Sequence, residues 1–179
     1  MTTALHVREL QLEDVAIVDE YWRTRTDEEL SGMGVDKDKL LKVNLATIIR
    51  DQLAVPYENK RIYFLIWMEG DKAVGHSNVN KITFCQEAYV HMHLWQPAHR
   101  QRGMGTEFVR KSSEWYFDKL QLKVLCCETH ALHSAPNRTL ARAGFRLSRS
   151  FEGTPGMVSL HQPVNVWELT REEFDSARS

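Results

Sequence analysis

Two glycines follow a basic loop at the point where an expected strand gives way to an expected helix. The loop carries Arg100 and Arg102, and the glycines are Gly103 and Gly105. Backbone N–H groups at the N-terminus of a helix have no partner within the helix and carry partial positive charge. Glycine leaves the backbone open to a ligand, and the two arginines add full charges. This combination predicts a binding site for a pyrophosphate group.

Two common phosphate-binding loops do not fit these residues. A P-loop requires Gly-Lys-Ser or Gly-Lys-Thr, whereas Gly103 is followed by Met104, Gly105 and Thr106. A dinucleotide-binding fingerprint requires a third glycine where this chain has Phe108. The remaining alternative is a helix that begins with two glycines and a basic loop and binds no ligand.

A histidine-rich strand precedes the glycine turn. Residues 87–95 alternate with period two, which places Tyr89, His91, His93 and Trp95 on one face of a sheet. An imidazole has an unperturbed pKa of about 6.5, which suits a general base near neutral pH. The alternative is that His91 and His93 are surface or core histidines whose nitrogens already have partners.

A metal site is the other chemistry that histidines and cysteines suggest. The candidate ligands lie on or just after two expected strands: they are His91, His93, Cys126, Cys127, His130 and His133. Zinc ligands usually occur as C-x₂₋₄-C or H-x₃₋₅-H pairs. Neighbouring residues of a strand point to opposite faces, so Cys126 and Cys127 cannot easily share one ion. We therefore expect no metal.

Helical and strand periodicities indicate the elements that must position these residues. Helices are expected at 13–22, 36–53, 103–120 and 134–143. Strands are expected at 6–9, 62–68, 73–84, 87–95, 122–129, 145–152 and 164–169. The order is helices, an antiparallel meander, and then strands alternating with helices, which is typical of a mixed α/β fold around a central sheet.

Length and composition fit one globular domain over residues 1–179, with 42% hydrophobic and 26% charged residues. The 23 basic and 24 acidic residues give a formal net charge of −1, which argues against a nucleic-acid partner. No apolar stretch approaches the ~18 residues of a membrane span, and no signal peptide is visible. Three cysteines, two of them adjacent, make a poor disulfide framework and favour a cytoplasmic protein.

Three segments of the chain carry motifs of a known family. Residues 100–105 fit the pattern Gln/Arg-x-x-Gly-x-Gly/Ala, and residues 137–145 form a short helix that closes in a Gly-Phe pair. In both respects the chain resembles the GNAT superfamily of acetyl-CoA-dependent N-acetyltransferases. Residues 166–174 look like the last strand of the branch that includes ribosomal-protein N-terminal acetyltransferases. The resemblance extends over residues 61–174 and does not identify the acceptor.

The resemblance implies an α/β (α+β) fold, with a mixed, mostly antiparallel central sheet flanked by helices and a splay between the fourth and fifth strands. It implies acetyl-CoA as co-substrate, with the pantetheine arm in the splay and backbone contacts from His93, Leu94 and Trp95. The other expected cofactor contacts come from the glycine turn and the next short helix: Arg100, Gln101, Arg102, Gly103, Met104, Gly105, Thr106, His133 and Asn137. His133 stands where the family usually has an asparagine.

The resemblance also suggests a general base for the acceptor amine. Glu128 stands 16 residues before Gly144, where the branch that acetylates ribosomal alanine carries its glutamate base. His91 and His93 are the rival bases. The alternative for Glu128 is a carboxylate at a strand edge, either solvated or paired with an arginine.

The acid that usually protonates the leaving thiolate is missing. The family often has a tyrosine at the position of Leu140, so His133, Ser134 or a water molecule would take its place. The developing oxyanion could accept a hydrogen bond from a backbone N–H near Leu94 or Trp95.

We therefore expect an enzyme that transfers an acetyl group from acetyl-CoA to a primary amine, by direct attack in a ternary complex. The amine could belong to a protein N-terminus, a lysine or a small molecule. The acidic residues Asp27, Glu28 and Glu29 could attract it, or they could form a solvated face. The alternative function is a non-catalytic acyl-CoA-binding or sensing module of the same fold. No nucleic acid or membrane is expected as a partner, and a homodimer is possible.

Overall fold

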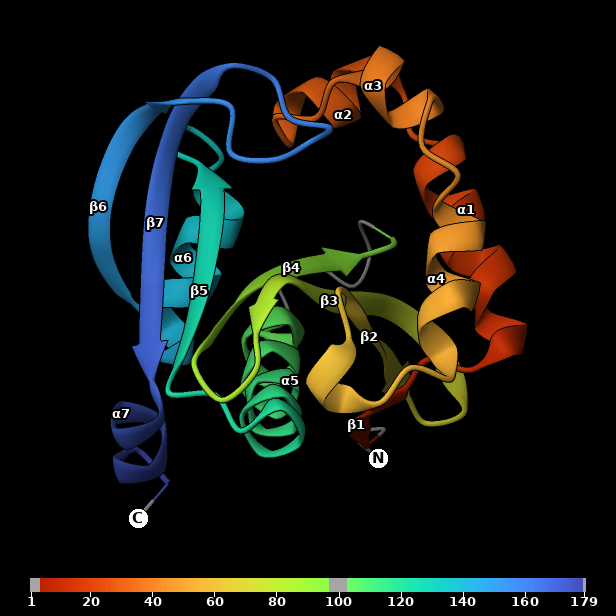
Figure 1. The fold of residues 1–179 in the computed structure, drawn as a ribbon. Helices are drawn as coiled ribbons and strands as arrows, with labels where there is room; N and C mark the ends of the chain where they lie inside the picture. Colours follow the sequence, from red (N-terminus) through yellow and green to blue (C-terminus); the bar gives the residue numbers. More distant parts are fainter. Residues whose placement is uncertain (1–3, 97–102, 179) are drawn as a thin grey trace.

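The computed structural model describes residues 4–96 and 103–178, and its centre is a seven-stranded sheet with helices on both faces (Figure 1). The strands are β1 (Leu5–Glu9), β2 (Tyr63–Glu69), β3 (Lys72–Thr83), β4 (Glu87–Leu94), β5 (Val124–His130), β6 (Arg146–Gly153) and β7 (Gln162–Thr170). Their order across the sheet is β1-β2-β3-β4-β5-β7-β6. The predicted α/β fold with a mixed, mostly antiparallel sheet is confirmed.

β4 and β5 run parallel, whereas the other neighbouring strands of this sheet run antiparallel. Their ladder is short, from Glu87 opposite Val124 to Tyr89 opposite Cys126. Both strands continue for several residues beyond the ladder, and Figure 1 shows them heading in different directions. The predicted splay between the fourth and fifth strands is therefore present.

The helices are α1 (Val15–Arg23), α2 (Asp27–Gly32), α3 (Lys37–Leu41), α4 (Leu45–Leu53), α5 (Met104–Leu120), α6 (Ser134–Ala143) and α7 (Arg171–Ser176). The single helix expected at 36–53 is wrong. The side chain of Asn44 accepts a hydrogen bond from the Thr47 N–H at 3.1 Å, so it begins α4 as a new helix. Within the described residues, no helix combines the length and the apolar character that a bilayer span requires.

The two faces of the sheet have different covers. One face, which we call the core face, packs against α5 and α6 through a large apolar cluster that includes Leu65, Val90 and Leu125. On the other face, α1 and α4 pack over β2, where Phe64 and Ile66 are buried. The side chains of this second face on β3, β4 and β5 are polar or aromatic, and we call it the histidine face: it carries His76, Asn78, Asn80, Tyr89, His91, His93, Cys126 and Glu128.

Helices α2 and α3 connect α1 to the loop between β6 and β7 (Figure 1). An isolated β-bridge joins Val35 to Ser159, and the Asp36 N–H donates to the Val158 carbonyl at 2.7 Å. The Leu160 N–H returns a bond of 2.9 Å to the carbonyl of Gly34. These bonds tie the N-terminal helices to the C-terminal strands on the side of the histidine face.

Candidate active site

The first turn of α5 carries the predicted phosphate turn. Gly103 precedes the helix with a φ of +77°, a left-handed conformation that costs residues with a side chain about 1–2 kcal/mol. In the part of the chain that the structure describes, no side chain caps the helix at this position. A Cβ built on Gly105 would meet Thr139 and Leu94 at 3.7–3.9 Å, which is ordinary van der Waals contact. The predicted contacts that lie outside the described residues are Arg100, Gln101 and Arg102.

The remaining two contacts predicted for this turn differ in exposure. The Met104 side chain is buried in the apolar cluster of the core face, so that its backbone is the part left for a ligand. Thr106 is half-buried. The first backbone N–H groups of a helix lack partners within the helix, so this end of α5 can accept an anion.

The last residues of β4 approach the start of α5. A Cβ on Gly75 would collide with the carbonyl oxygen of His93, so glycine is required there for β3 and β4 to lie this close. The Trp95 N–H then donates to the Val74 carbonyl at 3.0 Å. Leu94 lies 3.8 Å from a Cβ built on Gly105. The end of β4 and the start of α5 therefore lie in contact beside the splay.

His93 lies on the histidine face within an aromatic cluster. Its ring stacks on His76 with centroids 4.9 Å apart, and Trp22 packs edge-on at 4.6 Å. The Tyr21 hydroxyl lies 3.4 Å from His93 Nδ1. Tyr21 and Trp22 belong to α1, so the first helix reaches the end of β4.

His76 is fully buried beneath this cluster. Its Nδ1 accepts a hydrogen bond from the Trp95 indole at 2.7 Å, which assigns the ring proton of the neutral form to Nε2. Nε2 has no hydrogen-bond partner among the described residues. Burial, with a smaller effect of His91, lowers the pKa of His76 to about 3, so the ring is neutral at pH 7.

His91 is a weaker candidate for the general base than its position suggests. Burial, helped by the charge of Lys81, lowers the pKa of His91 to about 4. Its Nε2 lies 3.1 Å from the Asn80 side-chain oxygen. An imidazole with this pKa holds a proton poorly near neutral pH, so His93 is the more suitable of the two predicted histidines.

Glu128 lies on β5 opposite Val166, on the same face as His91 and Tyr89. Its Oε2 accepts a hydrogen bond of 2.6 Å from the Lys81 ammonium, and its side chain is 10% exposed. The carboxylate is therefore paired, with a lysine rather than the arginine that sequence reasoning considered. The position of Glu128 is compatible with a general base and with a carboxylate that only pairs with Lys81.

The side chain of Asn137, a predicted cofactor contact, is heavily hydrogen-bonded inside the protein. Its Oδ1 accepts bonds from Thr129 Oγ1, Asn165 Nδ2 and Trp167 Nε1, at 2.8, 3.0 and 2.9 Å. Its amide group donates to two backbone carbonyls, those of His130 and His133. This network fixes the start of α6 against β5 and β7.

The predicted contact His133 is half-buried and sits at the N-cap position of α6, where its backbone N–H donates to the His130 carbonyl at 3.0 Å. Leu140 is completely buried on the core face, so α6 offers no acid at that position. Ser134 is exposed at the first turn of the same helix.

The acidic run 27–29 forms the first turn of α2. The Glu29 side chain caps the helix with Thr26 and accepts a bond from Arg25 at 2.9 Å, and Asp27 pairs with Lys37. Acidic residues stabilise the N-terminus of a helix. These contacts give two of the three carboxylates a local structural role.

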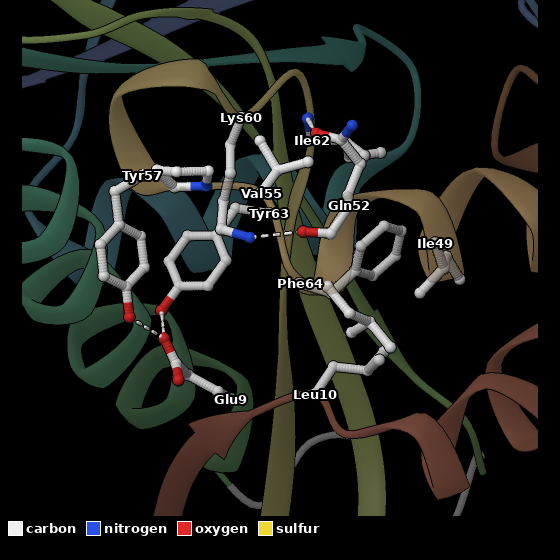
Figure 2. Close-up of a pocket in the computed structure, with 12 residues that line it drawn as sticks. Glu9, Leu10, Ile49, Gln52, Val55, Tyr57, Lys60, Ile62, Tyr63 and Phe64 are labelled. Carbon is white, nitrogen blue, oxygen red and sulfur yellow. Dashed lines mark hydrogen bonds between the residues drawn. The ribbon is translucent and has the colours of Figure 1, made fainter.

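A separate cavity of about 140 Å³ lies between β1, β2 and α4, away from the splay (Figure 2). Glu9 at one wall accepts hydrogen bonds from the hydroxyls of Tyr57 and Tyr63. Burial alone would raise the pKa of Glu9, but these bonds and two nearby lysines outweigh it and lower the pKa. Lys60 donates to the Gln52 carbonyl at 2.6 Å, and burial lowers the pKa of this lysine. The polar groups of this cavity largely satisfy one another.

The cysteines and histidines form no cluster suited to a metal ion in residues 4–96 and 103–178. Cys85, Cys126 and Cys127 are free thiols. Burial, followed by nearby carboxylates, raises the pKa of Cys126 to about 12, and burial also raises the pKa of Cys127. Neither buried thiol is a ready nucleophile.

Sequence reasoning did not single out three residues that the fold brings to the predicted site: Tyr21, His76 and Lys81. A pattern of alternating polar residues on the strand at 73–84 could have placed His76 on the histidine face. Tyr21 reaches the site from helix α1. Lys81 reaches it from the irregular end of β3. No local sequence signal marks either of them.

The chain matches the family described as "Acetyltransferase (GNAT) domain" over residues 4–146. It therefore belongs to the GNAT acetyltransferases, and the resemblance inferred from its motifs is confirmed. Among curated proteins, none is similar enough in sequence to count as a match.

Solved structures of several acetyltransferases share the fold. The aminoglycoside acetyltransferase AAC(6')-Ib in complex with coenzyme A has a TM-score of 0.72 and 16% identity, covering 98% of this chain and 100% of that chain. RimL, a ribosomal L7/L12 alpha-N-protein acetyltransferase in complex with coenzyme A, has a TM-score of 0.75 and 12% identity, covering 95% of both chains. Spermidine N-acetyltransferase from Vibrio cholerae in complex with CoA and spermine has a TM-score of 0.74 and 11% identity, covering 95% and 97%.

Proposed function

We propose that this protein transfers an acetyl group from acetyl-CoA to a primary amine. The observation that carries the proposal is the junction of two features. The strands β4 and β5 part after three ladder pairs, and the end of β4 lies against the glycine turn of α5 through Leu94 and Gly105. The similar structures named above hold coenzyme A, which supports the same ligand here.

The residues present fit coenzyme A. The first turn of α5, from Gly103 to Thr106, would hold the pyrophosphate with backbone N–H groups, because no side chain among the described residues caps them. The unpaired inner edges of β4 and β5 offer backbone groups to the pantetheine arm, as β-strand addition requires. Acetyl-CoA supplies the activated acyl group, and the protein supplies its orientation.

The chemistry requires an amine that has lost its proton. An α-amine has a pKa of about 7.7–8.0 and a lysine amine about 10.4, so a general base is useful near pH 7. Glu128 would accept this proton, directly or through water, with His93 as the alternative base. Both lie on the histidine face beside the splay. The amine nitrogen then bonds to the acyl carbon, the carbon–sulfur bond breaks, and the thiolate takes up a proton.

The end of β4 would stabilise the charge that develops on the acyl oxygen. A backbone N–H near Leu94 or Trp95 can donate to this oxygen, provided that it is not already used. The Trp95 N–H is used by the Val74 carbonyl, at 3.0 Å. We therefore assign this role to the Leu94 end of the strand.

Substitution of Gly105 tests the cofactor site. Gly105→Glu should weaken acetyl-CoA binding by at least about 100-fold, because a carboxylate would occupy the place of the pyrophosphate. The fold should persist, since a Cβ on Gly105 meets its neighbours at ordinary distances. The measurement is titration calorimetry with acetyl-CoA, combined with circular dichroism.

Gly32→Glu is the matched control, because a Cβ there meets nothing within 4 Å. Unchanged affinity in Gly105→Glu would remove the phosphate site from α5. A thiol-release assay with acetyl-CoA across peptides and small amines then separates an enzyme from an acyl-CoA-binding module. Tight cofactor binding without thiol release for any amine would favour the module.

A further inference from the structure

We propose that Lys81 is a positioning residue of this active site, holding Glu128 and the loop 153–156 in place across the face of β4. The inference rests on the proposed function, because it gives Glu128 the proton-accepting role described above. The contacts of the Lys81 ammonium are with Glu128, Pro155 and Tyr89. Its effect is exerted through the carboxylate and through the loop.

The backbone at Lys81 is irregular, and this irregularity places its side chain. In a regular strand the side chain would point to the core face, because Asn80 points to the histidine face. Instead, the pairing register of β3 and β4 shifts between Asn80 and Thr83, and Lys81 has a φ of +47°. Its ammonium lies 4.6 Å from the centroid of the Tyr89 ring, on the histidine face. A left-handed φ costs a residue with a Cβ about 1–2 kcal/mol, which the contacts of Lys81 must offset.

Two hydrogen bonds from the Lys81 ammonium reach segments that are remote in the chain. One goes to Glu128 Oε2 on β5, at 2.6 Å, and the other to the Pro155 carbonyl between β6 and β7, at 2.9 Å. The ammonium thus links β3, β5 and the β6–β7 loop near the point where β4 and β5 part. The same ammonium makes a cation–π contact with the ring of Tyr89 on β4.

The carboxylate needs this partner because its side chain is only 10% exposed, whereas that of Lys81 is 43% exposed. A poorly solvated carboxylate is costly without an opposite charge. The hydrogen bond from the ammonium fixes the orientation of the carboxylate, which a general base requires. Oε2 is engaged by Lys81, and no described residue donates a hydrogen bond to Oε1. Oε1 is therefore the oxygen left to accept a proton from the amine.

The loop gains from the same contact. Pro155 lies between Gly153 and Gly156, in a connection that also meets α2 and α3 through the Val158 carbonyl. Glycine and proline are typical of loops, whose backbone lacks the regular hydrogen bonds between paired strands. The bond from Lys81 therefore holds this loop beside Glu128 and fixes one border of the histidine face.

The test compares Lys81→Met and Lys81→Arg with the wild-type protein. Lys81→Met keeps the aliphatic stem and removes the charge. It should lower kcat about tenfold and leave the KM for acetyl-CoA within about twofold, because the carboxylate loses the partner that orients it. It should also speed amide hydrogen exchange of Gly153, Thr154 and Gly156 severalfold. Lys81→Arg should restore kcat to within about twofold of wild type, because it keeps the charge and the hydrogen-bond donors.

Lys72→Met is the matched control, since Lys72 is an exposed lysine of the same strand. An unchanged kcat in Lys81→Met would overturn the proposal, even if the melting temperature fell. Unchanged hydrogen exchange at Gly153, Thr154 and Gly156 would overturn the anchoring of the loop. If the wild-type protein acetylates no amine, the proposed function fails. The exchange experiment then still decides whether Lys81 holds the loop.

Discussion

The polar side chains buried beneath α5 satisfy one another, whereas the histidine face leaves one without a partner. On the core face, Trp67 donates to Ser112 at 2.8 Å, and the hydroxyls of Ser77 and Tyr116 are also 2.8 Å apart. On the histidine face, the buried Nε2 of His76 has no partner among the described residues. An unsatisfied buried donor costs about 1–3 kcal/mol.

The difference indicates what each face contributes. The core face contributes stability, because its apolar side chains pack together and its few buried polar groups are hydrogen-bonded to one another. The histidine face keeps groups that cost stability: a buried neutral histidine, a left-handed lysine and a nearly buried carboxylate. Such costs gather at functional sites. Substitutions on the two faces should therefore separate stability from activity.

The largest expected effect is on stability, from a substitution on the core face. Phe117 is completely buried and packs against Phe174 with ring centroids 5.2 Å apart. Phe117→Ala should lower the free energy of unfolding by about 3–5 kcal/mol, because it removes apolar contacts and leaves a cavity. Chemical denaturation measures the loss. The kcat of the folded fraction should stay within about twofold of wild type. A large fall in kcat would contradict the inference that the core face serves stability and the histidine face serves activity.

Glu128→Gln on the histidine face should show the opposite behaviour. If Glu128 is the base, kcat should fall about 100-fold, because the amide cannot accept the proton. The free energy of unfolding should fall by about 1 kcal/mol or less, since Lys81 is partly exposed and can be solvated. Steady-state kinetics over pH 6–9 measures the change.

Glu152→Gln, an exposed carboxylate on β6, is the control for Glu128→Gln. An unaltered pH–rate profile in Glu128→Gln would transfer the base to a histidine. His93 would then be the stronger candidate, because the pKa of His91 is lowered to about 4 by burial and by Lys81.

Strand periodicity predicted the part of the site that lies on β4. The alternation of Tyr89, His91 and His93 with Val90 and Met92 is an intrinsic property of a strand, and the structure follows it. The glycine turn at the start of α5 was predictable for the same reason: its chemistry is local. The splay itself was predicted by the resemblance to the family and could not be derived from periodicity.

Helix boundaries near the N-terminus were less predictable. Apolar residues continue from α3 into α4, which concealed the cap at Asn44. Helix α2 was not predicted, although Thr26 and Glu29 form a capping box that the sequence displays. The acidic residues between them were considered as a possible attraction for the acceptor.

Contacts between remote segments could not be predicted at all. Lys81 and Glu128 are 47 residues apart, and their bond depends on a register shift in β3. The Tyr21–His93 contact spans 72 residues and depends on how α1 packs against the sheet. Such pairs follow from tertiary packing, which no local pattern encodes.

The smallest expected effect is on the pH dependence of the free energy of unfolding. It tests whether burying a neutral histidine on the histidine face lowers stability at acidic pH. Burial lowers the pKa of His76 to about 3, against 6.5 for an ordinary histidine. Between these values the unfolded chain binds a proton that the folded chain does not, so stability falls as pH drops below 6.5. His76 alone should reduce the free energy of unfolding by about 1 kcal/mol from pH 7 to pH 5.5.

His91 acts in the same direction, because burial and Lys81 lower its pKa to about 4. His76→Phe should therefore remove about half of this loss while keeping an aromatic ring beneath His93. The carboxyls of Glu9 and Asp14, whose pKa values are lowered, stay ionised in both states over this range and do not contribute. Denaturation series at pH 7.0, 6.0 and 5.5 measure the slopes. Equal slopes for the wild type and His76→Phe would mean that His76 takes up its proton equally in the folded and unfolded states, so that the histidine face would not carry this cost.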